Sequence, residues 1–176
     1  MKKIIILLLL IQSTAFATTV RFETTLGNID IELFDNETPS HVANFLNYVE
    51  DGDYNDTVIH RLVPNFVLQG GGYRFDSGSL VPIPTDPEIN SEAGISNVRG
   101  TVALAKVGNR PSGDSQWFIN LKDNTTLDHT SGGYTVFGKI TEESMPVVDL
   151  IGSLRFVSEI PVFGFGSGQI LTQHLI

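Results

Sequence analysis

The 176-residue sequence contains no cysteine. This absence excludes disulfides, thiolate nucleophiles, iron–sulfur clusters and cysteine-ligated zinc. Basic residues are also scarce: 11 lysines and arginines stand against 20 aspartates and glutamates, for a formal net charge of −9. Because binding to a phosphate backbone requires a positive field, nucleic acid is not an expected partner.

Long apolar runs are missing as well. The run at residues 4–11 follows Lys2 and Lys3, precedes Ala15-Phe16-Ala17, and is far shorter than the roughly 20 residues that a membrane-spanning helix needs. A positive start, a short apolar stretch and a small-x-small site are typical of a secretory signal peptide. The sequence therefore predicts a signal peptide at residues 1–17 and one exported domain at residues 18–176, with no membrane attachment after cleavage. Apolar residues make up 41% of the chain, enough for a hydrophobic core.

Alternation of apolar and polar residues predicts mainly β structure. Residues 20–24 and 29–33 alternate on either side of Leu26-Gly27-Asn28 and predict a hairpin with one buried and one wet face. Further strands are expected near 57–63, 66–70, 97–105 and 115–121. Many strands with few helices favour a closed barrel capped by helices, because closure removes exposed sheet edges.

Two helices are expected. Apolar residues at i, i+3, i+4 and i+7 predict an amphipathic helix over about 39–50, with Thr38 as N-cap and Pro39 at its first position. A second, shorter helix is predicted from Ser144, with Pro146 in its first turn. Its expected buried stripe consists of Val147, Val148, Leu150 and Ile151.

Two of the expected strands carry polar groups that a core would not need. On the strand at 115–121, Phe118 shares its face with Gln116 and Asn120, and the pattern leaves open either a singly exposed phenylalanine or a binding platform. A turn at 64–65 is expected to fold Arg61 back toward Gln69 and the residues after the turn. The alternative for Arg61 is an ordinary surface ion pair.

Other motifs give weaker evidence of function. Gly70-Gly71-Gly72 lacks the Lys-Ser/Thr that follows in a phosphate-binding loop, so close backbone approach or strand-end flexibility is the better interpretation. The four histidines have no metal-ligand spacing, which predicts no metal site. A hydrolase built from Ser115, His60 and Asp128 lacks a nucleophile elbow around the serine.

Seven blocks of the chain resemble cyclophilins in the same order. They are FLNY (45–48), GDYN (52–55), HRLVPNFVLQGGG (60–72), RGTVALA (99–105), SQWFIN (115–120), LD (127–128) and YTVFGK (134–139). The resemblance covers about residues 20–152 and is to exported bacterial members in particular. It implies a closed eight-stranded antiparallel β-barrel capped by two α-helices, and a peptidyl-prolyl cis-trans isomerase that uses no metal and no cofactor.

The resemblance also implies roles for individual residues. Arg61, Gln69 and Phe118 match the catalytic positions, and His60 is interpreted as structural. Four residues differ from what is common in the family. Val67 stands where a methionine is common, and Tyr134 stands where many eukaryotic members have a histidine, as in bacterial members. Thr126 takes the place of an aromatic, and Lys106 replaces a frequent asparagine. The expected substrate-binding residues are Phe66, Val67, Ala105, Gln116, Thr126, Leu127 and Tyr134.

Two functions follow from this comparison. The first is a monomeric periplasmic or secreted isomerase that acts on proline-containing segments of unfolded or partly folded exported proteins. The alternative is a cyclophilin-fold proline-binding module or holdase with little catalysis. The presence of Arg61 favours the isomerase, because a surface that only binds proline does not need it.

Overall fold

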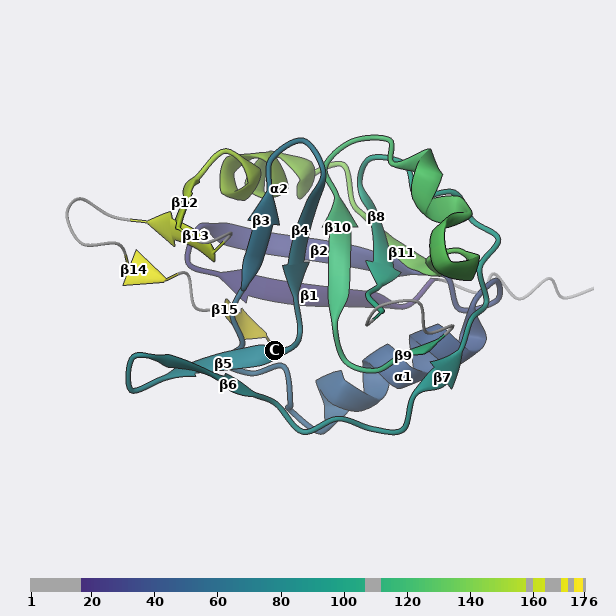
Figure 1. Cartoon of the computed structure of the whole chain (residues 1–176), viewed down its shortest axis with the longest axis horizontal. Helices are drawn as coiled ribbons and strands as arrows, with labels where there is room; N and C mark the ends of the chain where they lie inside the picture. Colours follow the sequence, from purple (N-terminus) through teal and green to yellow (C-terminus); the bar gives the residue numbers. More distant parts are fainter. Residues whose placement is uncertain (1–16, 107–111, 158–159, 164–168, 171–172, 176) are drawn as a thin grey trace, which may run out of the picture.

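The computed structural model describes residues 17–106, 112–157, 160–163, 169–170 and 173–175 (Figure 1). The predicted signal peptide lies outside these residues, except for Ala17. One large antiparallel sheet dominates, with the strand order β15-β1-β2-β11-β8-β10-β4-β3. Its strands are β1 (Thr19–Thr24), β2 (Gly27–Leu33), β3 (Arg61–Val63), β4 (Val67–Gly70), β8 (Thr101–Leu104), β10 (Trp117–Asn120), β11 (Val136–Ile140) and β15 (Gln173–Leu175).

The mainly β architecture with two helices is confirmed, whereas closure of the barrel is not shown. Within the described residues, no hydrogen-bonded ladder joins β3 to β15 at the two ends of the sheet. The strands are also shorter than alternation predicts. The expected strand at 57–63 begins only at Arg61, and the one at 97–105 begins only at Thr101, after Gly100 with φ 84°.

Short strands and 3-10 helices, which no regular spacing of apolar residues marks in the sequence, complete the fold. Three small sheets comprise β5 (Tyr73–Asp76) with β6 (Ser79–Pro82), β7 (Ile89–Asn90) with β9 (Ser112–Gly113), and β12 (Arg155–Val157) with β13 (Ile160–Phe163) and β14 (Gln169–Ile170). Two 3-10 helices follow β10, namely η1 (Thr125–Asp128) and η2 (Thr130–Gly132).

The helices lie on opposite sides of the strands, as Figure 1 shows. The first, α1 (Pro39–Glu50), has the predicted bounds, but the Thr38 side chain makes no capping hydrogen bond. Instead, the Glu92 carboxylate accepts the N–H groups of Ser40 (3.2 Å) and His41 (3.0 Å). A carboxylate from a distant loop therefore does what the N-cap was expected to do.

The second helix, α2 (Met145–Gly152), begins after Ser144 and has a proline in its first turn, as predicted. Its buried stripe is narrower than expected. Val148 and Ile151 are buried, whereas the prediction for Leu150 is wrong, because 48% of that residue is exposed. Only the part of the apolar stripe that faces the sheet is covered.

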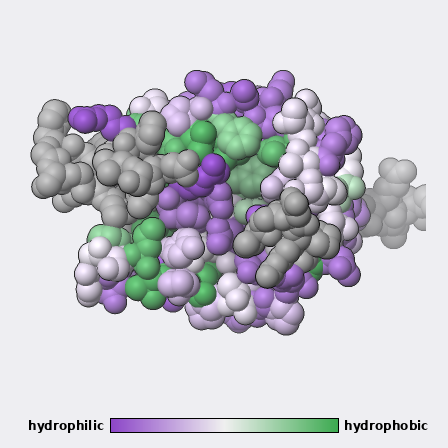
Figure 2. Space-filling view, viewed as in Figure 1, coloured by the Kyte–Doolittle hydropathy of each residue, from purple (hydrophilic) through white to green (hydrophobic). Residues whose placement is uncertain are grey.

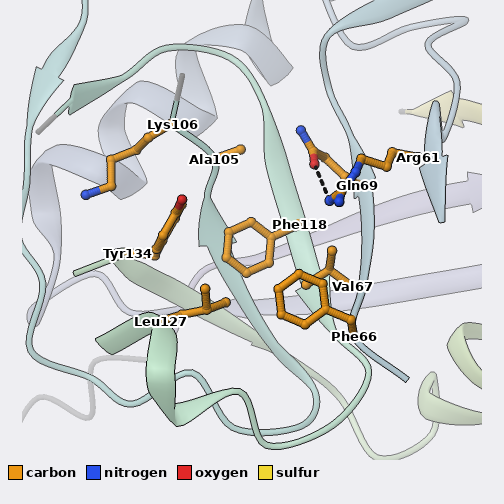
Figure 3. Close-up of a pocket in the computed structure, with 9 residues that line it drawn as sticks. All are labelled: Arg61, Phe66, Val67, Gln69, Ala105, Lys106, Phe118, Leu127 and Tyr134. Atoms are coloured by element: carbon orange, nitrogen blue, oxygen red, sulfur yellow. Dashed lines mark hydrogen bonds between the residues drawn. The ribbon is translucent and has the colours of Figure 1, made fainter. Parts of the chain in front are cut away.

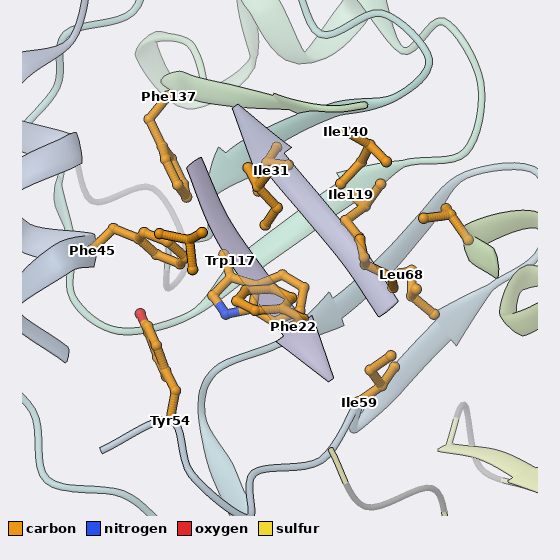
Figure 4. Packing of buried hydrophobic residues seen from close by; sticks show 14 of the residues in the cluster. Phe22, Ile31, Phe45, Tyr54, Ile59, Leu68, Trp117, Ile119, Phe137 and Ile140 are labelled. Carbon is orange, nitrogen blue, oxygen red and sulfur yellow. The ribbon is translucent and has the colours of Figure 1, made fainter. Parts of the chain in front are cut away.

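The main core contains stacked aromatic rings between the sheet and α1 (Figure 4). The rings of Phe22 and Trp117 have centroids 4.8 Å apart, and the predicted hairpin β1–β2 supplies Phe22 on its buried face. A Cβ at Gly70 or Gly71 would come within 2.8 and 2.6 Å of Trp117. Close backbone approach to this indole is therefore the reason for glycine at both positions.

The N-terminal end of the described chain is attached to the start of the loop after β2. The Thr18 carbonyl accepts the Leu33 N–H at 2.8 Å, and the Thr18 N–H donates to the Asp35 carboxylate at 2.8 Å. Thr18, one residue after Ala17, is thus held by two hydrogen bonds just before β1.

Candidate active site

A pocket of about 160 Å³ lies on the outer face of the large sheet, over β4 and β10. Figure 2 shows apolar side chains gathered on this face beside strongly hydrophilic ones. The pocket is lined by Arg61, Phe66, Val67, Gln69, Ala105, Lys106, Phe118, Leu127 and Tyr134 (Figure 3). Eight of these nine residues are sequence-predicted site residues; Lys106 is the one that the prediction did not include.

The β3–β4 hairpin places the polar end of the pocket. Arg61 lies opposite Gln69 in the register, as the expected turn at 64–65 requires. Asn65 has φ 55°, a left-handed conformation that asparagine tolerates better than most residues. One Arg61 guanidinium nitrogen donates to Gln69 Oε1 at 3.4 Å (Figure 3). The hairpin therefore aims a fixed cation and an amide at one end of the pocket.

Phe118 forms the floor of the apolar end. It is only 4% exposed, which excludes the interpretation as an isolated surface phenylalanine. The Tyr134 ring meets it edge to face, with centroids 5.6 Å apart and planes at 75°. Val67 and Leu127 belong to the same small cluster, against which Phe66 packs. This arrangement leaves a shallow apolar slot beside the arginine.

Two predicted binding residues do not line the pocket. Gln116 is not part of the lining, but its Oε1 accepts a hydrogen bond from Gln69 Nε2 at 2.9 Å. Thr126 is exposed on η1, and its carbonyl accepts the Thr130 hydroxyl at 2.8 Å. A substrate contact by Thr126 therefore stays a prediction, and Gln116 acts on the pocket through Gln69.

A buried amide network supports the apolar wall, and the sequence interpretation missed it. Asn124 Nδ2 donates to the Phe66 carbonyl at 2.9 Å and to Asn120 Oδ1 at 2.8 Å. Asn120 in turn donates to Asn97 at 3.1 Å, and Asn97 donates to Asp128 through its backbone and side chain. The only signal for it was the polar Asn120 on the Phe118 face of β10.

The electrostatics of the pocket differ from those of the whole chain. Among the described residues, its lining contains two cationic side chains, Arg61 and Lys106, and no acidic one. The Lys106 ammonium donates to two backbone carbonyls, and burial lowers its pKa. In an acidic protein, this face therefore presents hydrogen-bond donors in a locally positive environment.

Other chemistries find no support in the described residues. Ser115 Oγ is buried without a hydrogen-bond partner there, so the serine is not activated by His60. Asp128 is occupied by Ser96 and Asn97. No group of three or more histidine, aspartate or glutamate side chains suited to a metal occurs in the described part of the chain. Among the same residues, no helix is long and apolar enough to cross a membrane.

These observations define a class of protein. An antiparallel sheet carries a small apolar slot next to hydrogen-bond donors, and the described residues include no activated nucleophile beside it. Such a site suits noncovalent recognition of a peptide rather than bond cleavage.

Comparisons with known proteins identify the family. The family model for cyclophilin type peptidyl-prolyl cis-trans isomerases matches residues 19–162, and the chain belongs to this family. A peptidyl-prolyl cis-trans isomerase of Acinetobacter baylyi is 43% identical over 161 residues, which cover 88% of this chain and 84% of the relative. Peptidyl-prolyl cis-trans isomerase A of Dickeya dadantii is 39% identical, with 92% and 87% covered. The protein is thus a peptidyl-prolyl cis-trans isomerase.

Solved structures agree on the fold. A cyclophilin type isomerase of Cryptosporidium parvum, crystallised in the presence of the dipeptide Ala-Pro, superposes with a TM-score of 0.71. It is 20% identical, and the match covers 90% of this chain and 99% of that one. The sequence identity is low, so this likeness concerns the fold.

Proposed function

We propose that the pocket at Arg61 and Phe118 is the site at which this isomerase rotates X–Pro bonds, and that its substrates are exported proteins. The apolar slot would receive the proline ring, and the arginine would face the amide that rotates. The observation that carries this assignment is the Arg61–Gln69 pair at the end of a slot floored by Phe118.

The energetic demand explains these residue types. Rotation of a prolyl amide must overcome about 18–20 kcal/mol and takes roughly 10–100 s without a catalyst. A rate on the order of 10³ per second would need about 10⁵-fold acceleration, or roughly 7 kcal/mol. No bond breaks, so this stabilisation has to come from groups that bind the twisted amide better than the planar one.

Arg61 supplies such a group. In the twisted state the amide nitrogen loses conjugation, becomes pyramidal and accepts a hydrogen bond more readily. A guanidinium that is held in place by Gln69 can donate to the substrate around this bond without reorganising. Gln69, itself held by Gln116, would also hold the substrate backbone.

The remaining lining residues would bind the ring and its flanks. Phe118 closes the floor, Phe66 and Val67 lie toward the hairpin, and Leu127 and Tyr134 lie toward η1 and η2. Ala105 contributes a small wall at the rim. Because these contacts are the same in the planar and twisted states, they would contribute to substrate binding more than to the rate.

The decisive experiment measures cis–trans exchange of an Ala-Pro peptide by NMR, with wild type and two arginine variants. Arg61→Ala should lower kcat/KM by at least about a hundredfold, the usual effect of losing one preorganised donor. Thermal unfolding should hardly change, because the side chain faces a pocket and not the core. Arg61→Lys should restore activity only in part, since an ammonium cannot reproduce the planar fork.

Arg21→Ala is the matched control. Arg21 forms its ion pair with Asp30 on the exposed face of the β1–β2 hairpin, outside the pocket lining, and its loss should leave exchange unchanged. Activity of Arg61→Ala within a few-fold of wild type would move the active site elsewhere. It would also revive the proposal that this groove only binds proline.

The proposal of exported substrates rests on residues 1–17. They combine Lys2 and Lys3, an apolar run and the Ala15-Phe16-Ala17 site, the pattern of a cleaved secretory signal. In an exported compartment, newly arrived chains carry X–Pro bonds in mixed isomers that relax slowly. A monomeric isomerase with an open pocket fits substrates of this kind.

A further inference from the structure

Lys106 lines the pocket, yet its ammonium points away from the slot toward the turn that precedes Tyr134 (Figure 3). We propose that Lys106 is a positioning residue that ties this turn to the pocket wall and so fixes the Tyr134 ring against Phe118. The inference rests on the proposed function of the pocket, because it concerns how well the slot holds proline.

The first observation is that one ammonium joins two carbonyls. Lys106 follows β8 directly after Ala105, and its Nζ donates to the carbonyl of Ser131 at 3.1 Å and to that of Gly133. Both carbonyls belong to the segment immediately before Tyr134. A cation between two carbonyl oxygens offsets their mutual repulsion and sets the path by which the chain reaches Tyr134.

The second observation is that this turn has an unfavourable backbone. Ser131, Gly132 and Gly133 have φ of 52°, 78° and 83°, so three consecutive residues are left-handed. For the non-glycine Ser131 this conformation is disfavoured. A segment of this kind needs contacts from outside itself to keep one conformation, and Lys106 supplies two of them.

The third observation is a chain of contacts from the ammonium to the floor of the slot. Lys106 Nζ lies 5.0 Å from the centroid of the Tyr134 ring, within the range of a cation–π interaction. The same ring meets Phe118 edge to face. Figure 3 shows Tyr134 standing between Lys106 and Phe118.

The kinetic signature follows from what the slot does. Tyr134 and Phe118 would contact the proline ring alike in the planar and twisted states, so loosening Tyr134 removes uniform binding. The expected result is a higher KM with kcat nearly unchanged. This split differs from the loss at Arg61, which should appear mainly in kcat.

The test compares Lys106→Met, which keeps the apolar stem, with Lys106→Arg, which keeps a cation with several donors. For an Ala-Pro peptide, Lys106→Met should raise KM by about three- to tenfold while kcat changes by less than about twofold, and Lys106→Arg should restore most of the affinity. Lys122→Met makes the same chemical change at an exposed lysine outside the pocket lining, and it should behave as wild type.

Nuclear Overhauser contacts between the rings of Tyr134 and Phe118 give a readout that does not depend on activity. They should weaken in Lys106→Met and return in Lys106→Arg. Either an unchanged KM or unchanged ring contacts in Lys106→Met would overturn the inference, as would an equal KM increase in Lys122→Met. If Lys106→Met does not fold, Lys106→Gln takes its place with the same expected direction.

The two proposals fail in different ways. If wild type accelerates exchange but Arg61→Ala does so equally well, the assignment of the active site fails, and the ring contacts still decide the role of Lys106. If Arg61→Ala is inactive and Lys106→Met binds the peptide as wild type does, only the positioning role fails.

Discussion

His60 stands directly before the arginine of the proposed site, and its pKa lies well below the ordinary value for histidine. Burial lowers the pKa of His60 to about 4, and a hydrogen bond with Gln116 offsets this only in part. Its ring meets the Tyr73 ring edge to face at 4.8 Å. Within the described residues, Nδ1 is buried without a hydrogen-bond partner. The folded protein therefore holds this imidazole neutral.

The neutral His60 makes stability depend on pH. The unfolded chain binds a proton near pH 6.5, whereas the folded chain resists it down to about 4. The free energy of unfolding should therefore fall as pH is lowered through this window, by at most ~3 kcal/mol, and show no further loss from this group below it. Urea unfolding at several pH values measures this.

His60→Gln is the variant that isolates this effect. Its free energy of unfolding should depend less on pH between about 6.5 and 4 than that of wild type. His129→Gln, which changes an exposed histidine at the C-terminal end of η1, serves as the control for the chemical change from imidazole to amide. Identical pH profiles for His60→Gln and wild type would contradict the buried neutral state.

The pocket residues could be predicted where the alternation of side chains along a strand puts them on the same face of the sheet. Arg61 and Gln69 share one face because side chains alternate along the β3–β4 hairpin, and Phe118 joins them from the neighbouring strand. Lys106 was not predictable in this way. Its role depends on the conformation of a turn 25 residues further along the chain, and no local pattern encodes that contact.

At the scale of elements, α1 depends on a contact from outside itself. The Glu92 carboxylate accepts two backbone N–H groups of the first turn and lies 2.7 Å from His41 Nδ1. Glu92→Ala should lower the free energy of unfolding by about 1–2 kcal/mol, since it removes the only side-chain acceptor at this helix end among the described residues. Glu37→Ala, an exposed acid just before the helix, should have a much smaller effect.

The contribution of Glu92 also has a defined sign with pH. Burial alone would raise the pKa of Glu92, but hydrogen bonds from His41 and Ser40 outweigh it, and the pKa is lowered. The stabilisation is therefore complete above the ordinary pKa of 4.5 and is lost as pH falls through the lower folded value. Equal stability of Glu92→Ala and wild type at neutral pH would show that the carboxylate does not support the helix.

Helices and strands could be predicted where their apolar residues repeat with a regular spacing. The bounds of α1 follow from its i, i+3, i+4 pattern and Pro39, but its capping partner is about 50 residues away and left no local signal. Strand ends were overestimated, because apolar residues continue into loops that are buried for other reasons. The 3-10 helices that carry Leu127 and precede Tyr134 have no such pattern at all.

For the whole molecule, charge is distributed in a way that composition cannot show. The chain has a formal net charge of −9, yet the pocket lining, as far as the structure describes it, carries two cations and no acid. The sequence correctly predicts a mainly β fold of this family, because alternation and the seven blocks agree. Barrel closure depends on how the strands near the C-terminus meet β3, and no pattern after Gly152 specifies this.

The contact between Thr18 and Asp35 bears on the stability of the whole fold. If the signal is removed after Ala17, the Thr18 amide becomes a free ammonium at the position where its N–H now donates to the Asp35 carboxylate at 2.8 Å. Intact mass of the exported protein should show a chain that begins at Thr18. A soluble species that retains Met1 to Ala17 would contradict this cleavage.

The new ammonium should stabilise the mature fold slightly and in a salt-dependent way. The chain that begins at Thr18 should unfold at a higher temperature than the same chain with its amine acetylated, and Asp35→Asn should abolish the difference. Equal unfolding temperatures at low salt would show that the amine and Asp35 do not interact.

The contact between Thr18 and Asp35 would connect removal of the signal peptide with the stability of the fold. If the signal is cleaved after Ala17, the neutral donor that Thr18 offers to Asp35 becomes a charged one, and folding brings these two groups, which are 17 residues apart in the sequence, into contact. Processing during export would then also change the stability of the protein. The cut would add an electrostatic contact just before β1, so that the delivered form is held more firmly than the form still carrying its leader.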